Sequence, residues 1–197
     1  MKILKRYQME LFKHYYKIIL FFFFISVGFG FQQNKEEISL IGKEAPGIYL
    51  FTLEGEEFFL SDVLNKKKYV FINFFATWCS PCIEELPDLI ELHKESKDKV
   101  EMIIIDVNNL SPLNPETKVP ELKEEDIEEV AKALKDIDFI KLYDIYARTA
   151  DDFNISQNPV LPQSFLISED GVVIWEFRGR LKPNNIEDLK QMIGGKN

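Results

Sequence analysis

Two nearly continuous apolar, β-prone runs on either side of one helical stretch constrain the fold more than any other feature of the sequence. The first run covers 69–75 (Tyr-Val-Phe-Ile-Asn-Phe-Phe) and the second 100–107, with Met-Ile-Ile-Ile at its centre. Such runs are typical of strands that are covered on both faces. The intervening segment, 80–96, carries an apolar stripe at helical spacing, made of Ile83, Leu86, Leu89, Ile90 and His93. Strand, helix and strand in this order predict a right-handed crossover between parallel strands.

The segments around this unit complete one α/β domain with a mixed sheet. Apolar segments at 48–53 and 58–60 flank the turn Glu54-Gly55-Glu56-Glu57, which is a hairpin signal. The further elements that we expect are a helical turn at 61–64, an acidic helix at 120–136, a strand at 139–143, a helix at 145–153, hairpin strands at 163–167 and 172–178, and a helix at 184–192.

The first 31 residues have the pattern of an export segment. Residues 1–17 carry five cations and one anion, and an uncharged run with four consecutive Phe follows at 18–31. A positive region before an apolar one describes a secretory signal. The apolar run is shorter than the ~20 residues of a spanning helix, but Tyr15 and Tyr16 can lengthen it at the membrane interface. A signal peptide cleaved after Gly30 and an uncleaved membrane anchor therefore both stay open.

The domain organisation follows from this pattern. We expect residues 1–31 to be the signal peptide or anchor, 32–39 a linker and 40–195 the folded domain. Export predicts a location in the periplasm or at the outer face of the cytoplasmic membrane, with contact to the membrane through the N-terminal segment.

The charge balance excludes a nucleic-acid partner. The chain has 33 acidic and 24 basic side chains, a net charge of -9. Residues 1–30 carry a net +4, so the remaining chain carries -13. Nucleic-acid binding rests on clustered cations, whereas an acidic surface promotes solubility and steers basic partners.

The chain has two cysteines, and both fall in Cys79-Ser80-Pro81-Cys82, directly after the first buried strand and at the start of the helix. At a helix N-terminus, unpaired backbone N–H groups and the helix dipole favour a thiolate, so we expect a lowered pKa for Cys79. Cys82, one turn along, can attack a mixed disulfide formed on Cys79. Pro81 fits the first turn because its missing N–H would be unpaired there. The pattern indicates dithiol redox chemistry, with the disulfide itself as the redox group and no other cofactor.

The cysteine pair has three other interpretations. A zinc site needs two further ligands, and the chain offers only His14, in the export segment, and His93, a full helix away. A copper carrier would need a longer cysteine spacing and a dedicated histidine. A purely structural disulfide is the serious alternative in an exported protein, although so small a loop constrains little chain entropy.

The stretch 69–85 resembles the active-site strand and helix of the thioredoxin superfamily. The chain as a whole is similar to its exported branch, the ResA/TlpA-like thiol-disulfide oxidoreductases of cytochrome c biogenesis, which have a redoxin (AhpC/TSA-Redoxin-like) domain. The lead-in Ile41-Gly42-Lys43-Glu44-Ala45-Pro46, the Gly-turn hairpin and the insertion at 120–143 match that branch. The resemblance implies a thioredoxin-like fold: a central mixed sheet flanked by helices, with an N-terminal β-hairpin extension and a central helix-strand insertion.

The resemblance also implies roles for single residues. Pro162 stands where the family has a cis proline against the cysteine pair, and the backbone of Leu161 would pair with a bound substrate strand. Glu85 matches an acid that tunes proton transfer, although a first-turn acid favoured by the helix dipole explains it equally well. Trp78 and Pro81 would contact substrate beside the disulfide.

Four further positions bear on this resemblance. Asn73 stands where cytoplasmic thioredoxins keep a buried Asp, which favours the exported branch. Gln163-Ser164 departs from the small hydroxyl pair usual after the proline, which leaves substrate selection open. Asp144, after its strand, is either a second acidic neighbour of the site or a solvated loop acid, and we interpret it as the latter.

The predicted function is an exported thiol-disulfide oxidoreductase that reduces disulfides of partner proteins through Cys79 and Cys82. The resemblance implies apocytochrome c as a substrate and a membrane thiol reductant as electron donor. Two alternatives stay open at this point: a dithiol oxidase or isomerase on the same fold, and a non-catalytic binding module with a structural disulfide.

Overall fold

The computed structural model describes residues 39–64, 66–110, 124–135, 137–156 and 160–194. The predicted export segment, 1–31, and nearly all of the predicted linker lie outside these residues, as does the start of the predicted helix at 120–136. Within the described part of the chain, no helix combines the length and the apolarity needed to cross a membrane.

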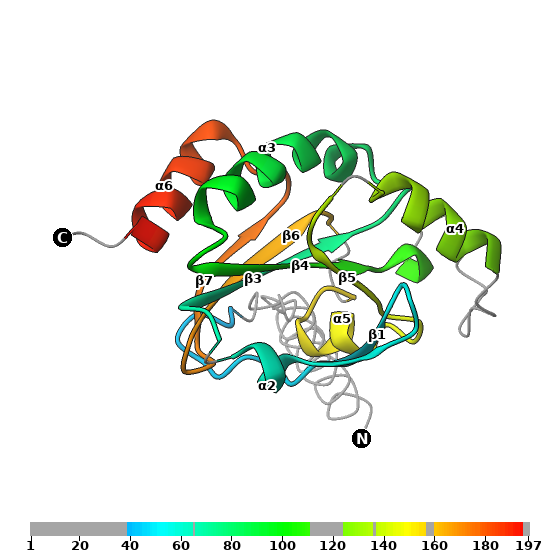
Figure 1. Ribbon diagram of the computed structural model, residues 1–197, viewed down its shortest axis with the longest axis horizontal. Helices are drawn as coiled ribbons and strands as arrows, with labels where there is room; N and C mark the ends of the chain where they lie inside the picture. The colour runs from blue at the N-terminus through cyan, green and yellow to red at the C-terminus, as the bar shows by residue number, and fades with distance from the viewer. Residues whose placement is uncertain (1–38, 65, 111–123, 136, 157–159, 195–197) are drawn as a thin grey trace, which may run out of the picture. The chain divides into compact units, whose positions relative to one another are not determined.

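A mixed sheet of seven strands, in the order β2-β1-β5-β4-β3-β6-β7, forms the centre of the domain (Figure 1). Strands β3, β4 and β5 run parallel, and the other pairs are antiparallel. The strands are β1 (Tyr49–Thr52), β2 (Glu57–Phe59), β3 (Tyr69–Phe75), β4 (Val100–Asp106), β5 (Ile140–Tyr143), β6 (Gln163–Ser168) and β7 (Val173–Arg178).

Helices cover both faces of this sheet. Figure 1 shows α3, α4 and α6 on one side and α5 on the other, with α3 and α6 in contact. The helices are α2 (Leu60–Val63), α3 (Ser80–Ser96), α4 (Glu124–Ala133), α5 (Arg148–Asp152) and α6 (Pro183–Gly194), and a short 3₁₀ helix, η1, covers Asn108–Leu110. The parallel arrangement expected for this crossover is confirmed, because α3 connects the parallel strands β3 and β4.

Burial on both faces explains the two apolar runs. From Val70 to Phe75 every residue of β3 is buried, and β4 is buried at every position except Glu101. On the α5 side, Phe74 packs against Phe153 and Phe165, with ring centroids 5.3 and 5.9 Å apart. Because side chains alternate along a strand, Phe75 faces the side that carries α3.

The N-terminal hairpin and the central insertion form one part of the sheet. Strand β1 pairs with β2 and also with β5, where Phe51 lies opposite Tyr143. The expected hairpin extension is therefore confirmed, and it widens the central sheet through the inserted strand.

The apolar stripe predicted for 80–96 is wrong at one position. Leu86 and Leu89 are buried, but Ile83 is 41% exposed. The first turn of α3 stands at the edge of the sheet, where only its inward residues, such as Cys82, are covered.

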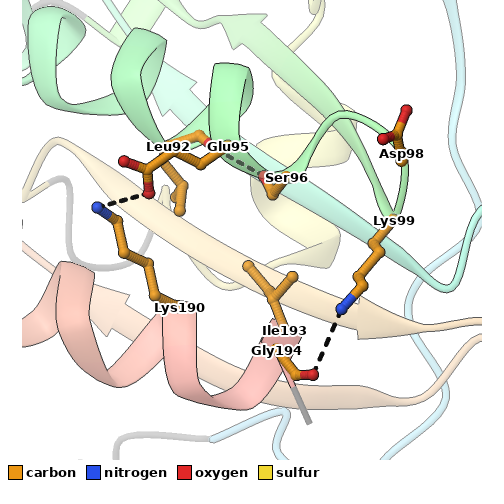
Figure 2. A pocket seen from close by; sticks show the side chains of 8 residues that line it. All are labelled: Leu92, Glu95, Ser96, Asp98, Lys99, Lys190, Ile193 and Gly194. Carbon is orange, nitrogen blue, oxygen red and sulfur yellow. Dashed lines mark hydrogen bonds and ion pairs between the residues drawn. The ribbon is translucent and has the colours of Figure 1, made fainter.

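A surface pocket lies between the C-terminal ends of α3 and α6, at the far end of α3 from the cysteines (Figure 2). Lys190 Nζ lies 2.7 Å from Glu95 Oε2, and Lys99 Nζ donates to the carbonyl of Gly194 at 3.3 Å. A 17-residue helix is about 25 Å long at ~1.5 Å per residue. The pocket is therefore separate from the cysteine pair.

Candidate active site

The cysteine pair lies where the parallel strand β3 passes into helix α3. Cys79 is the N-cap residue of α3, and it forms a disulfide with Cys82, with Cα atoms 5.3 Å apart. Both residues are buried in this oxidised state, Cys82 slightly more than Cys79. Pro81 occupies the first turn and is exposed, as its missing N–H allows.

The start of α3 supplies a hydrogen bond to the first sulfur. The backbone N–H of Cys82 donates to Cys79 Sγ at 3.3 Å. In the reduced protein the same N–H group and the positive end of the helix dipole would face the Cys79 thiolate, and both lower the free energy of the charged form.

The loop before the cysteines is held by a residue that the sequence did not single out. Asn108 Oδ1, in η1, accepts hydrogen bonds from the Thr77 N–H at 2.7 Å and from Thr77 Oγ1 at 3.1 Å. The carbonyl of Asn108 accepts from Trp78 Nε1 at 3.1 Å. Asn108 therefore fixes both residues in front of Cys79. The sequence offered one sign of this role, the pair Asn108-Asn109 after a buried strand, and such a pair is also typical of an ordinary loop.

Leu161 and Pro162 lie at the same edge of the sheet as the cysteines. Gln163, the first residue of β6, pairs with Phe74 near the end of the antiparallel strand β3. The Leu161–Pro162 peptide bond is cis, as the resemblance implies, and both residues are buried. Gln163 Nε2 donates to the carbonyl of Val160 at 2.9 Å, which joins the segment before the proline to β6.

A buried carboxyl group lies one turn further along α3. Glu85 is fully buried, and its Oε1 accepts from Asn73 Nδ2 at 2.9 Å, while its Oε2 accepts from the backbone N–H of Leu181. Asn73 Nδ2 also donates to Ser164 Oγ at 3.0 Å. This Glu85 cluster (Asn73, Glu85, Ser164 and the Leu181 N–H) joins β3, α3, β6 and the segment before α6. Glu85 is thus a buried, hydrogen-bonded carboxyl group and not a solvated acid in the first turn of α3.

Burial raises the pKa of Glu85 from its ordinary value of 4.5 to about 7, and the hydrogen bonds from Leu181 and Asn73 oppose that shift only in part. Residues three apart on a helix are neighbours on its surface, so the carboxyl group of Glu85 lies on the same side of α3 as Cys82. A group with a pKa near neutrality beside a thiol can accept or donate a proton under physiological conditions.

Asp144 is not the solvated loop acid expected from the sequence. It is buried, and its carboxylate accepts from the backbone N–H groups of Arg148 at 3.1 Å and Ala150 at 2.8 Å at the start of α5. Burial raises its pKa to about 6 against these hydrogen bonds. Asn109 Nδ2 donates to the carbonyls of Asp144 and Ile145. Asp144 therefore stabilises the fold of the neighbouring loop, a role that needs the α5 backbone and is invisible in the sequence.

In the described residues, no group of three His, Cys, Asp or Glu side chains is arranged to hold a metal ion. Of the residues predicted for the site, Trp78, Cys79, Cys82 and Glu85 form one continuous stretch around the start of α3, and Leu161 and Pro162 share its edge of the sheet. Trp78 is half-buried beside the disulfide.

Comparison with known proteins decides the family. The redoxin family model matches residues 40–193. The thiol-disulfide oxidoreductase ResA of Bacillus cereus (strain ATCC 10987 / NRS 248) is 37% identical over 185 residues, which cover 89% of this chain and 93% of the relative. The chain belongs to the ResA-type thiol-disulfide oxidoreductases of the redoxin family. ResA of Bacillus subtilis (strain 168) is 30% identical over 161 residues, covering 81% of this chain and 79% of the relative.

Solved structures show the same fold. A putative thiol:disulfide interchange protein DsbE from Chlorobium tepidum superposes with a TM-score of 0.60 at 23% identity, covering 79% of this chain and 96% of that structure. A putative protein disulfide isomerase from Bacteroides thetaiotaomicron also gives a TM-score of 0.60, at 21% identity, covering 80% and 92%. The thioredoxin-like fold is thus confirmed, and this ResA-type protein is an enzyme whose C-x-x-C pair is Cys79 and Cys82.

We predict that Asn108→Ala lowers the free energy of unfolding by about 1–3 kcal/mol, because the Thr77 N–H loses its acceptor in a partly buried site. Urea denaturation of the oxidised protein measures this change. Asn108→Asp is the matched control, since its carboxylate keeps the acceptor oxygen. Equal destabilisation by the two variants would show that Asn108 acts only through packing.

We predict that Glu85→Gln removes a pH dependence of stability. The folded protein holds a proton on Glu85 more tightly than the unfolded chain does, because the pKa rises from 4.5 to about 7 on folding. The contribution of Glu85 is therefore fully present below pH 4.5 and is lost as the pH rises through about 7. The measurement is the unfolding free energy of variant minus wild type across that window. This difference should increase with pH, and a constant or decreasing difference would contradict the assignment.

Proposed function

We propose that the protein is an exported dithiol reductase in which Cys79 is the nucleophile and Cys82 the resolving thiol. The proposal rests on one observation: Cys79 is the N-cap residue of α3, and its sulfur accepts a hydrogen bond from the Cys82 N–H. The Cys79 thiolate attacks one sulfur of the substrate disulfide and releases the other as a thiolate. Cys82 then attacks Cys79 Sγ, which releases the second substrate thiol. Two electrons pass to the substrate, and the Cys79–Cys82 disulfide remains.

Glu85 is proposed as the group that exchanges protons with this couple. When Cys82 loses its proton to become a nucleophile, a carboxylate one turn along can accept it, and a pKa of about 7 allows the return. A buried acid also disfavours a second negative charge on the sulfurs, which favours the disulfide over the dithiolate. A couple whose reduced form is not stabilised is a reductant rather than an oxidant.

Substrate contact is proposed at the edge of the sheet that holds Trp78, Pro81 and Leu161. The backbone of Leu161 would pair with an extended substrate strand, with the cis Pro162 next to it. The substrate class that the family resemblance suggests is the haem-attachment cysteine pair of apocytochrome c. Re-reduction requires a thiol donor, which for an exported protein is a membrane thiol reductant, and the pattern of residues 1–31 supports a location in the periplasm or at the outer face of the cytoplasmic membrane.

We predict that the full chain with Cys82→Ser accumulates covalent partners in its native host. Without the resolving thiol, the mixed disulfide on Cys79 persists, and mass spectrometry of non-reduced complexes identifies the partner. The double variant Cys79→Ser/Cys82→Ser is the control, and it should capture nothing. Adducts of equal amount in the double variant, or no adduct that dithiothreitol releases from the single variant, would contradict the roles of the two cysteines.

A further inference from the structure

Three aromatic side chains stand exposed on one face of the β1–β2 hairpin. Tyr49 is 51% exposed, Phe51 42% and Phe59 39%. The ring of Tyr49 stacks on Phe59 with centroids 4.7 Å apart and lies 5.7 Å from Phe51. We call these three residues the hairpin patch. Exposed aromatic clusters of this kind mark interaction surfaces more often than single exposed apolar residues do.

The strand register places the hairpin patch at the same edge of the sheet as the cysteines. Phe75, the last residue of β3, lies level with Asp106 of β4, and Asp106 lies level with Tyr143 of β5. Phe51 pairs with Tyr143. Because β1 runs antiparallel to β5, Tyr49 and its partner Phe59 extend further toward that edge.

The hairpin patch also faces the side of the sheet on which α3 lies. Residues level with each other on neighbouring strands point to the same face, so Phe51 shares the face of Phe75, which is the α3 face. Tyr49, two residues from Phe51, and Phe59, opposite Tyr49, share it too. Leu50 and Phe58, which point the other way, are buried.

The charge around the hairpin patch is negative. Glu57 lies opposite Phe51 on the same face and accepts a hydrogen bond from the Tyr49 hydroxyl at 2.7 Å. Glu54 and Glu56, in the turn, are exposed, and the one cation on the neighbouring strand β5, Lys141, is only half exposed. An aromatic surface bordered by acids at the turn end of the hairpin is complementary to a polypeptide that carries apolar and basic side chains together.

We propose that the hairpin patch is a second docking site for the protein substrate. It binds an extended segment of the substrate that lies next to the disulfide being reduced and carries alternating apolar and basic side chains. This inference rests on the proposed function, because it names the class of polypeptide that the same active site accepts. Three strand spacings separate β3 from β1, about 14 Å in all. An extended peptide segment of about five residues, attached to the substrate disulfide and called the arm below, spans that distance.

The test uses pre-reduced full chain in detergent and synthetic peptides with an intramolecular Cys-x-x-Cys disulfide. One peptide has no arm, one has an arm of about seven residues alternating Leu and Lys, and one has the same arm with Glu for Lys. The second-order rate constant of reduction is measured by released thiol. The Lys arm should raise the rate constant by about fivefold or more, and the Glu arm should not. A Lys arm of two residues should give no gain.

Matched variants locate the effect. Phe59→Lys puts a cation on the hairpin patch, and the ratio of rate constants with and without the Lys arm should fall to about 1. Ile41→Lys is the control. Ile41 is 53% exposed, and its neighbour Gly42 is hydrogen-bonded to Val173 at the end of the sheet opposite the cysteines. The ratio of rate constants with and without the Lys arm should therefore stay high in this variant. The arm-length series in the wild-type protein tests the same claim if Phe59→Lys does not fold.

The outcomes separate this proposal from the function on which it rests. If no peptide is reduced, the reductase proposal fails. If all peptides are reduced at the same rate, or if Phe59→Lys leaves the ratio unchanged, the docking proposal alone is overturned. Two further results would overturn it, both with the effect of the Lys arm unchanged. If Phe59→Lys abolishes self-association in ultracentrifugation, the occupant is a second copy of the chain. If Phe59→Lys abolishes sedimentation with phosphatidylcholine vesicles, the occupant is a membrane.

Discussion

The hydrogen bonds to the buried carboxyl group of Glu85 are the interactions that join the elements around the cysteine pair. A carboxylate without partners would be too costly to bury, and here the Asn73 amide and the Leu181 N–H supply hydrogen bonds. These bonds join β3, the start of α3 and the segment before α6, and Asn73 adds β6 through Ser164. Burial raises the pKa of Glu85 to about 7, because these hydrogen bonds oppose the shift only in part.

In the reduced protein, two opposing electrostatic effects act on the charge of the Cys79 and Cys82 sulfurs. The N-terminus of α3 favours negative charge on Cys79 through the Cys82 N–H, whereas in our proposal Glu85, one turn along, disfavours charge on the pair. The dipeptide Ser80-Pro81 brings no charge of its own. In the proposed mechanism a thiolate forms on one sulfur at a time and Glu85 exchanges the proton, which suits stepwise disulfide exchange better than a stable dithiolate does.

Local patterns predicted the centre of this molecule well, and long-range contacts explain what they missed. The strand β3, the helix α3 and the redox pair were all predicted, because the apolar run and the two cysteines lie within one stretch of chain. Asp144 looked like a loop acid because the α5 N–H groups that hold it become visible only in the fold. Asn108 supports Thr77 from 31 residues away, a separation that no spacing rule reports.

The reduction potential of the Cys79–Cys82 couple in the full chain tests the central claim most directly. Equilibration with glutathione or dithiothreitol buffers, followed by thiol trapping, gives the value. A buried acid beside a helix-capping thiol predicts a reducing couple, near the thioredoxin value of about -270 mV and below about -220 mV. A potential near -120 mV, where the reduced form is strongly stabilised, would contradict the assignment of the protein as a reductant and of Glu85 as the residue that sets its direction.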